Sequence, residues 1–333
     1  MPASTAVKIG GGLPVTEAIC GRRRRVYTAP HHGINCMTRS VLGILGGSGV
    51  YDLPGLEQLR EQRLSTPWGE PSDLLRFGRI GTTDVVFLSR HGPGHRIAPS
   101  GVNYRANIDA LKRAGVTDLV SLTACGSYRE ELPPGSFVLV DDFIDRTFGR
   151  ENSFFGNGCV AHIPFAHPIG PRLQERIALA AQAEDIMVHR GGICVCMEGP
   201  QFSTLAESNF YKAMGCDVVN MTSMPEAKLA REAEITYAVI AMVTDYDCWH
   251  PEHEKVDVAA VVRAMQANRS RAQRLIMRLA ADFPEVHESC PAGSDRALDD
   301  AIVTAPEARD PDLLARLDAV AGRVLRPGSK DLS

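Results

Sequence analysis

Short apolar runs recur along the chain, and the segments between several of them carry apolar residues at helical spacing. The runs are rich in Val, Ile and Leu, which is typical of strands buried on both faces of a sheet. They predict strands at residues 41–45, 84–89, 118–122, 136–144, 192–197, 217–221 and 235–240. The helical spacing predicts helices at residues 103–113, 173–183, 204–214, 225–233, 258–281 and 310–325. Such alternation predicts an α/β fold.

Two of the predicted helices carry clear start signals. Thr204 stands three residues before Glu207, which is the spacing of a capping box. Pro225 opens the helix at 225–233, where a proline is tolerated because the first-turn N–H has no partner within the helix. Residues 146–171 are instead rich in Gly, Pro, His and Phe, and we expect a long functional loop there.

The two ends of the chain differ from its centre. Residues 1–36 contain four consecutive arginines and no periodic pattern, so we expect them to be poorly ordered, with Met37 opening the protein. A basic targeting segment is the alternative, although it would lack the apolar core of a secretory signal. We expect residues 37–284 to form the main domain and residues 285–333 to form a helical C-terminal extension.

The composition limits the partners and the compartment. The net charge is −4, so no basic field points to nucleic acid or to an anionic membrane as a partner. The nine cysteines are odd in number and form no C-x-x-C pair, which favours reduced thiols in a cytoplasmic protein over disulfides or a zinc site. No apolar run is long enough to span a bilayer.

Three predicted strands end in groups that suit an anion. The turn at 46–49 is glycine-rich and carries Ser48, so its backbone N–H groups can approach a ligand closely. Arg90 and His91 follow the second strand, where a guanidinium fork can pair with phosphate and a protonated imidazole can donate. Thr123 follows the third. One such end is common, but three predict a phosphate-sized ligand.

Other interpretations of the same segments are weaker. The glycine turn, which alone could be a plain tight turn, matches neither G-x-G-x-x-G nor G-x-x-x-x-G-K-[ST], so a dinucleotide or Walker-type site is disfavoured. A metal site built from His91 and His95 is disfavoured because the glycines and proline between them oppose the helix that would align both rings.

Two carboxylates follow the strand predicted at 235–240. Asp245 and Asp247 stand two residues apart, so we expect them to leave the strand on the same side and to face one pocket. Ligands bind at this edge of open α/β sheets. Two close carboxylates resist joint ionisation, so one of them can keep a proton and donate to a ring nitrogen. The alternative is a loop of solvated acids with Trp249 as a plug.

Together, the strand-end motifs resemble those of one family, the methylthioadenosine phosphorylases of the trimeric purine nucleoside phosphorylase superfamily. The resemblance covers residues 41–281. The motifs that carry it lie at 43–50, 89–92, 103–107, 123–127, 145–147, 198–203, 220–222 and 244–249. It implies a single domain with a central mixed β-sheet flanked by helices, a homotrimer, inorganic phosphate as co-substrate, and neither a metal nor an organic cofactor.

The resemblance also implies roles for individual residues. Matching the phosphate site are Ser48, Arg90, His91, Thr123, Ala124 and Thr222. Matching the nucleoside site are Phe202 at the purine face, Met221 under the ribose, Asp245 and Asp247 at the 6-amino group and N7, and His162, Val258 and Val261 near the 5′-alkylthio group, with His162 from a neighbouring subunit. Many family members have Thr where this chain has Ser48, and both side chains keep a hydroxyl. A lone aromatic such as Phe202 is otherwise usually a core residue.

The expected reaction is phosphorolysis of methylthioadenosine to adenine and 5-methylthioribose 1-phosphate, with Asp245, Arg90 and His91 as the catalytic residues. A 6-oxopurine nucleoside or methylthioinosine phosphorylase of the same fold is the nearest alternative, although the acidic pair speaks against it. A dinucleotide-binding dehydrogenase and a non-enzymatic nucleoside-binding protein are alternatives from other classes.

Overall fold

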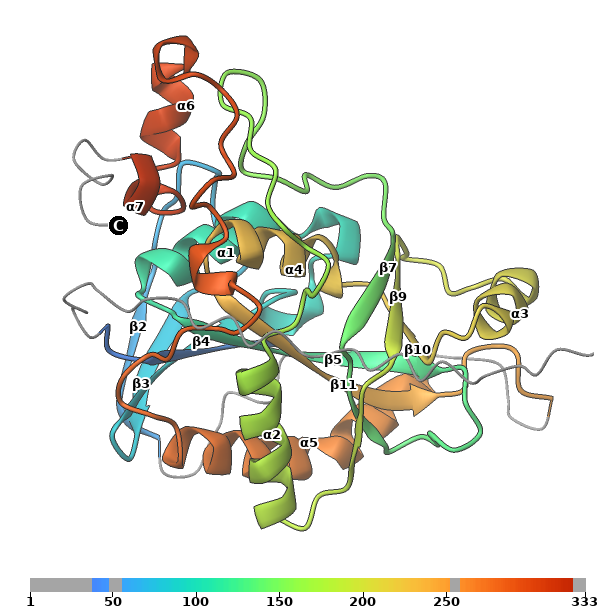
Figure 1. Cartoon of the computed structure of the whole chain (residues 1–333). Helices are drawn as coiled ribbons and strands as arrows, with labels where there is room; N and C mark the ends of the chain where they lie inside the picture. Colours follow the sequence, from blue (N-terminus) through green and yellow to red (C-terminus); the bar gives the residue numbers. More distant parts are fainter. Residues whose placement is uncertain (1–37, 48–55, 252–257, 326–333) are drawn as a thin grey trace, which may run out of the picture. The chain divides into compact units, whose positions relative to one another are not determined.

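The computed structural model describes residues 38–47, 56–251 and 258–325, all within a unit that spans residues 36–333 (Figure 1). The N-terminal segment 1–36, the expected start at Met37 and the expected phosphate-site residue Ser48 lie outside the described residues. The disorder of the N-terminal segment therefore stays a prediction. The predicted boundary between residues 284 and 285 also stays a prediction.

Within the described part of the chain, a mixed sheet of eleven strands forms the centre of the fold. The strands are β1 (Val41–Gly46), β2 (Glu57–Gln62), β3 (Leu75–Ile80), β4 (Thr83–Ser89), β5 (Asp118–Ser127), β6 (Phe137–Leu139), β7 (Asp142–Arg146), β8 (Val188–Arg190), β9 (Ile193–Met197), β10 (Val218–Asn220) and β11 (Thr236–Asp245). Their main order is β2-β3-β4-β1-β5-β10-β9-β7, and β11 pairs with β5 and β6. The α/β class and the mixed sheet are thus confirmed.

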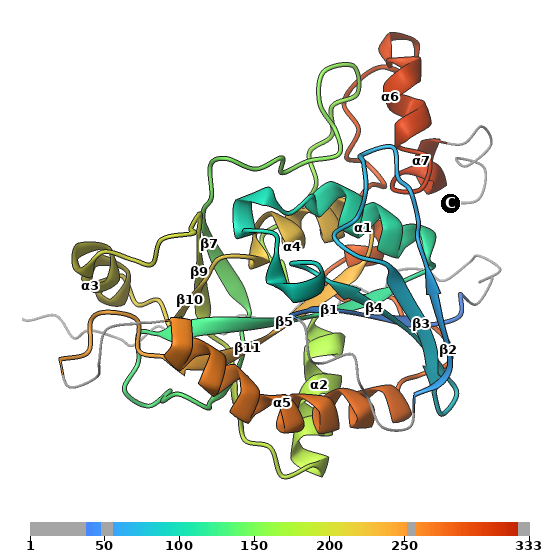
Figure 2. The ribbon, with the colours of Figure 1, turned by 180° about the vertical axis from the view of Figure 1, so that it is seen from behind.

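Helices cover both faces of this sheet. The described α-helices are α1 (Tyr104–Arg113), α2 (Pro171–Ala183), α3 (Leu205–Ala213), α4 (Ser223–Glu232), α5 (Val258–Ala281), α6 (Pro311–Arg316) and α7 (Gly322–Leu325). Helices α1 and α4 lie on one face and α2 and α5 on the other, as the two opposite views show (Figures 1 and 2). No helix within the described ranges is long and apolar enough to cross a membrane.

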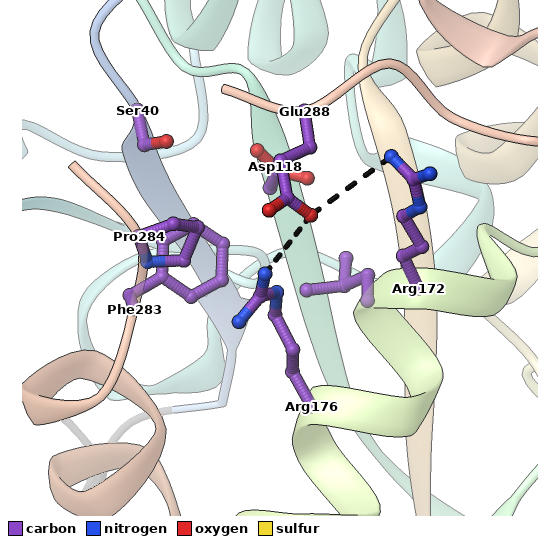
Figure 3. Close-up of a pocket in the computed structure, with 8 residues that line it drawn as sticks. Ser40, Asp118, Arg172, Arg176, Phe283, Pro284 and Glu288 are labelled. Atoms are coloured by element: carbon purple, nitrogen blue, oxygen red, sulfur yellow. Dashed lines mark hydrogen bonds and ion pairs between the residues drawn. The ribbon is translucent and has the colours of Figure 1, made fainter. Parts of the chain in front are cut away.

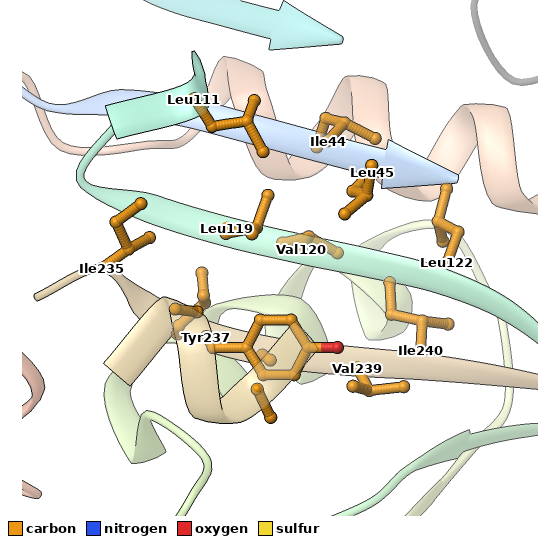
Figure 4. Close-up of a cluster of buried hydrophobic side chains, with 14 of the residues drawn as sticks. Ile44, Leu45, Leu111, Leu119, Val120, Leu122, Ile235, Tyr237, Val239 and Ile240 are labelled. Atoms are coloured by element: carbon orange, nitrogen blue, oxygen red, sulfur yellow. The ribbon is translucent and has the colours of Figure 1, made fainter. Parts of the chain in front are cut away.

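The core forms where β1, β5 and β11 run in parallel. Leu45, Val120 and Val239 come from these three strands and are at most 1% exposed (Figure 4). Strand β5 pairs with β1 along one edge and with β11 along the other, and helices cover both faces of the sheet, so nine of the ten residues of β5 are buried. Burying such side chains stabilises the fold by about 1.5–3 kcal/mol for each large one.

β5 is also where the sheet divides. Its pairing with β1 ends at Ser121, and its antiparallel pairing with β10 begins at Gly126. Between these two points, no described strand pairs with this edge of β5. Thr123 and Ala124 fall in this gap. The sequence predicts both residues beyond the end of a shorter strand, but pairing with β11 extends β5 to Ser127.

Most of the predicted elements are confirmed. The capping box is present, because the Thr204 hydroxyl accepts from the Glu207 N–H at 3.2 Å while the Glu207 carboxylate accepts from the Thr204 N–H at 2.8 Å. Helix α4 begins with Ser223, but Met224 has non-helical angles, so its regular turns start at Pro225 as expected. Residues between β7 and α2 form no described helix or strand, which agrees with the predicted loop.

Two element predictions are wrong. The run at 136–144 is two strands, β6 and β7, because the chain leaves the sheet at residues 140–141 and the two halves then pair with different neighbours. The segment at 310–325 is not one helix. The regular turns of α6 end at Arg316, and α7 begins only at Gly322.

Candidate functional site

Strands β1 and β4 end at the same level of the sheet, beside the middle of β5, which continues to Ser127. Ser89 pairs with Gly46, and Leu45 pairs with Ser121. The Arg90 N–H donates to the Gly46 carbonyl at 3.0 Å, which brings Arg90 over the end of β1. Two of the expected anion-binding segments, at Arg90 and Thr123, therefore converge at the end of β1, while residues 48–49 of the glycine turn lie outside the described residues.

Two hydroxyl groups meet at this edge. The Thr123 and Thr222 Oγ1 atoms lie 3.2 Å apart, and the two side chains are 6% and 5% exposed. Thr123 lies in the gap of β5, and Thr222 directly precedes α4 without capping it. Each hydroxyl has one hydrogen, which it can donate either to the other hydroxyl or to a ligand. The pair provides neutral donors for an anion.

Arg90 is held in a buried ion pair. Its Nε donates to Oε2 of Glu226 at 2.7 Å and its Nη2 to Oε1 at 3.0 Å, a bidentate arrangement. Further bonds run from Nη2 to the Ser121 hydroxyl at 2.7 Å and from Nη1 to the Leu122 carbonyl at 3.1 Å. Burial opposes the charge, but the Glu226 carboxylate outweighs it and raises the pKa of Arg90 above its ordinary value. Arg90 is thus a fixed cation.

His91 is neutral at neutral pH. Burial, together with the charge of Arg90, lowers its pKa to about 4. Its Nδ1 lies 2.8 Å from the carbonyl of Ile97, so Nδ1 carries the hydrogen and Nε2 is an acceptor. The His95 ring stacks on it with centroids 4.1 Å apart. Within the described ranges, no cluster of His, Cys, Asp and Glu could hold a metal ion.

The two acids lie next to each other, but not for the reason the sequence suggested. Asp245 ends β11, with a register shift before it, and Asp247 lies beyond the strand at φ 53°. Strand alternation therefore does not apply. Instead the chain turns back, so that the Asp247 N–H donates to Oδ1 of Asp245 at 2.8 Å. Both side chains lie over Gly126, where an added Cβ would come within 2.9 Å of the Asp245 carboxylate. A side chain at position 126 would collide with the pair.

Burial shifts both acids towards the protonated form. Burial raises the pKa of Asp245, and the negative charge of Asp247 raises it further. Hydrogen bonds from the Thr244 hydroxyl and the Asp247 N–H to the Asp245 carboxylate lower this pKa, but they do not outweigh burial. Burial likewise raises the pKa of Asp247. Oδ2 of Asp247 has no hydrogen-bond partner among the described residues. The interpretation of the pair as solvated acids is therefore wrong, since Asp247 is only 6% exposed.

Trp249 does pack beside the acids. Its Nε1–H donates to the Ser127 carbonyl at 2.7 Å, and its ring contacts the small apolar cluster around Tyr128 and Tyr211. Trp249 thus fixes the loop after the acids against the end of β5.

A buried arginine that the sequence analysis missed holds Met221, the residue expected under the ribose. Arg150 is 1% exposed, and its Nη1 donates to the carbonyls of Met221 at 2.7 Å and Met224 at 2.6 Å. Its Nη2 donates to the Glu198 carbonyl at 2.6 Å. Arg150 belongs to the predicted loop, so this loop ties together the segments that follow β9 and β10. An arginine in a loop gives no sequence signal for such a role.

Glu198 is a second missed residue. Its carboxylate accepts from the Phe148 N–H at 2.7 Å, from the Gly149 N–H at 3.2 Å and from the Ser100 hydroxyl. Burial would raise its pKa, but these hydrogen bonds outweigh burial and lower the pKa to about 2. Phe202 follows in the same segment and is 42% exposed, so the interpretation of Phe202 as a core residue is wrong.

The residues expected near the 5′ group come from two different segments of the chain. Val258 and Val261 begin α5, and Val258 is 68% exposed. The His162 side chain is exposed in the long loop, where the backbone N–H of His162 donates to the Ala301 carbonyl at 2.8 Å. The C-terminal segment therefore contacts the part of the long loop that carries His162.

Two cavities among the described residues lie away from these side chains. One of about 10 Å³, enough for a water molecule, lies at the amino end of β5 beside Asp118, where Arg172 and Arg176 both face Glu288 (Figure 3). Another, of about 260 Å³, is lined by Asp141, His167, Ile169, Pro171, Gln174, Pro291 and Ala292. Neither includes a predicted site residue. Residues 48–55 and 252–257, which adjoin the site in sequence, lie outside the described part.

Known proteins share this sequence and fold. The model of the Phosphorylase superfamily matches residues 41–281. The chain is 65% identical over 290 residues to an S-methyl-5′-thioadenosine phosphorylase of Bradyrhizobium diazoefficiens, covering 87% of this chain and 100% of that protein. A similar protein of Cereibacter sphaeroides is 58% identical, covering 86% and 99%.

Solved structures agree with these sequence relatives. A methylthioadenosine phosphorylase from an Antarctic soil metagenomic library has a TM-score of 0.78 at 42% identity, covering 85% of this chain and 99% of that one. The Schistosoma mansoni methylthioadenosine phosphorylase in complex with adenine has a TM-score of 0.69 at 41% identity, covering 72% and 90%. The chain therefore belongs to the Phosphorylase superfamily, and within it to the S-methyl-5′-thioadenosine phosphorylases.

Proposed function

We propose that the chain catalyses the phosphorolysis of 5′-methylthioadenosine, giving adenine and 5-methylthioribose 1-phosphate. The observation that carries this proposal is the order of groups along β5. The hydroxyl pair of Thr123 and Thr222 lies at one point, and the acidic pair lies over Gly126, three residues further on. Three residues of strand span about 10 Å. This spacing suits a phosphate at one end of a ribose and a purine at the other.

Phosphate is bound mainly by neutral donors in this proposal. The two threonine hydroxyls and the backbone of Ala124, in the gap of the sheet, supply them, and Ser48 adds another hydroxyl. The Arg90–Glu226 pair has no net charge, so Arg90 contributes more to the orientation of the bound phosphate than to its electrostatic attraction. His91 can accept a hydrogen bond through Nε2 from a protonated phosphate oxygen, since its Nδ1–H is directed to Ile97.

The chemistry follows from charge development in the transition state. Breaking the C1′–N9 bond builds positive charge on the ribose and negative charge on the base. Phosphate below C1′ stabilises the cationic sugar and then forms the new C1′–O bond. Asp245, whose pKa is raised by burial, gives a proton to N7, and adenine leaves as a neutral base.

Substrate selectivity rests on the acids and on the apolar 5′ residues. Asp247 accepts from the 6-amino group, which a 6-oxopurine lacks, so adenine-type nucleosides are preferred over methylthioinosine and inosine. Phe202 stacks on the purine, and Met221 lies under the ribose. An apolar pocket made with Val258 and Val261 prefers methylthio over hydroxyl by only about 1–3 kcal/mol, so some adenosine is cleaved too.

The proposal includes a homotrimer in the cytoplasm, with no metal or organic cofactor. Support for the oligomer is the exposed His162, together with exposed apolar side chains such as Phe148, 87% exposed, and Val258. Seven described cysteines are free, as expected for a cytoplasmic protein. In the oligomer, His162 approaches the 5′ group bound by a neighbouring subunit.

Adenine release tests the proposal. Purified chain is incubated with methylthioadenosine in the presence and absence of inorganic phosphate, with methylthioinosine, adenosine and inosine as comparison substrates. We expect release that depends on phosphate and is fastest with methylthioadenosine. Binding without release would favour a nucleoside-binding protein, and faster release from methylthioinosine would favour the 6-oxopurine alternative.

A further inference from the structure

The Arg90–Glu226 pair is the most deeply buried ion pair at the candidate site. The side chains are 2% and 1% exposed. We infer that Glu226 is a positioning residue for phosphate, acting through the orientation of Arg90. This inference rests on the proposed function, but Glu226 belongs to none of the sequence motifs and to none of the predicted site residues.

Glu226 decides which edge of the guanidinium is free. The Nε and Nη2 edge is taken by the two carboxylate oxygens at 2.7 and 3.0 Å. Nη2 also donates to Ser121, and Nη1 donates to Leu122. A guanidinium has two N–H groups on Nη1, so one of them has no partner among the described residues. Arg90 can therefore offer phosphate a single N–H in a fixed direction.

Glu226 is itself fixed from a third element. The Tyr237 hydroxyl donates to Oε1 of Glu226 at 2.8 Å, and Tyr237 is 1% exposed in the middle of the core (Figure 4). Glu226 lies in the first turn of α4, four residues after Thr222. The side chain of Glu226 thus links helix α4, whose start carries the phosphate-site hydroxyl, to β11 and to the residue that directly follows β4.

This arrangement also determines the charge of the site. A buried guanidinium without its carboxylate would carry an uncompensated charge and would seek other acceptors. Loss of Glu226 therefore releases Arg90 from its direction, even though it makes the site more positive. If phosphate binding depended only on net charge, Glu226→Gln would strengthen it. If binding depends on direction, the same variant weakens it.

Steady-state kinetics and calorimetry separate these alternatives. We expect Glu226→Gln to raise the KM for phosphate about tenfold or more, with the KM for methylthioadenosine changed less than about threefold. Titration calorimetry with inorganic phosphate alone should show the same loss of affinity. The matched control is Glu232→Gln, a buried carboxylate on the same helix that faces the long loop, and it should leave the phosphate KM unchanged. A lower or unchanged phosphate KM in Glu226→Gln overturns the inference.

A double-mutant cycle tests whether Glu226 acts through Arg90. In an Arg90→Ala background, Glu226→Gln should have no further effect on phosphate affinity, because no guanidinium remains to be oriented. An effect of the same size in both backgrounds contradicts the inference. Failure of the proposed function is distinct, since it would appear in the wild-type chain as adenine release that does not depend on phosphate.

A milder variant covers the case in which Glu226→Gln does not fold. Tyr237→Phe removes one hydrogen bond to Glu226 and leaves the ion pair in place. We expect the phosphate KM to rise about two- to fivefold while the nucleoside KM stays the same. A phosphate KM equal to that of the wild type, in a folded Tyr237→Phe protein, would refute the positioning role.

Discussion

The Oγ1 atoms of Thr123 and Thr222 lie 3.2 Å apart although 99 residues separate them in the chain. This contact joins the gap in β5 to the start of α4. It brings together two residues that no local sequence pattern relates. The proposed phosphate site is built around it.

Thr222→Val should therefore impair phosphate binding selectively. The variant keeps the shape of the side chain and removes one donor to a charged ligand, a loss of about 1.5–3 kcal/mol. We expect the phosphate KM to rise about 10- to 100-fold, measured at saturating methylthioadenosine. Thr304→Val is the control, because Thr304 lies in the C-terminal segment, where its hydroxyl accepts from the backbone N–H of Val160. An equal rise in both KM values would argue against a phosphate role for Thr222.

Asp245→Asn should change base selectivity. An amide cannot give a proton to N7 as an acid does, and its NH2 group can donate to a 6-oxo group. We expect slower cleavage of methylthioadenosine and a relative gain for methylthioinosine, measured as the ratio of the two kcat/KM values. Asp118→Asn at the opposite end of β5 is the matched control. Retention of the wild-type ratio by Asp245→Asn would show that Asp245 does not read the base.

Glu232 makes stability depend on pH. Burial raises its pKa from 4.5 to about 7, although its carboxylate accepts from the Phe154 N–H and the Ser153 hydroxyl. The unfolded chain then loses this proton at lower pH than the folded chain. The stabilisation contributed by Glu232 is therefore complete below about pH 4.5 and is lost progressively as pH rises to about 7, by about 3 kcal/mol in all.

Urea unfolding between pH 5 and 8 measures this contribution. Glu232→Gln cannot ionise, so its free energy of unfolding should fall less with rising pH than that of the wild type. Glu175→Gln, at an exposed position on α2, should follow the wild-type curve. Parallel curves for wild type and Glu232→Gln would mean that Glu232 ionises alike in both states.

Arg150→Met should destabilise the whole fold. The substitution leaves the carbonyls of Met221, Met224 and Glu198 without their buried donor. Each unsatisfied group costs about 1–3 kcal/mol, partly relieved by local rearrangement. We expect the free energy of unfolding to fall by about 3 kcal/mol, measured by urea denaturation. Arg190→Met, which breaks an exposed ion pair, should cost no more than about 1 kcal/mol. Equal effects would show that Arg150 is not an anchor.

The fold could be predicted from the sequence wherever burial imposes a pattern. The apolar runs that begin β5 and β11 are buried under helices and between neighbouring strands, so their positions could be predicted, but the pairing of the two strands extends both beyond the predicted ends. β2 escaped prediction because all of its residues are exposed and its sequence is polar. The division of the run at 136–144 depends on which strands each half meets, and that is a tertiary property.

The site was predictable to a lesser extent. Strand-end residues such as Arg90, Thr123 and Asp245 have a positional signal, since ligands bind at the carboxyl edge. Glu226 and Arg150 have none. A glutamate in the first turn of a helix ordinarily suggests a favourable charge near the helix N-terminus. That it meets Arg90, 136 residues away, follows only from the fold.

A crystal structure of the chain with inorganic phosphate and an uncleavable methylthioadenosine analogue tests the central claim most directly. We predict phosphate oxygens within hydrogen-bonding distance of the Thr123 and Thr222 hydroxyls, with the purine N7 and 6-amino group facing Asp245 and Asp247 in the same pocket. Phosphate bound away from the two threonines, or a purine bound away from the acids, would contradict it.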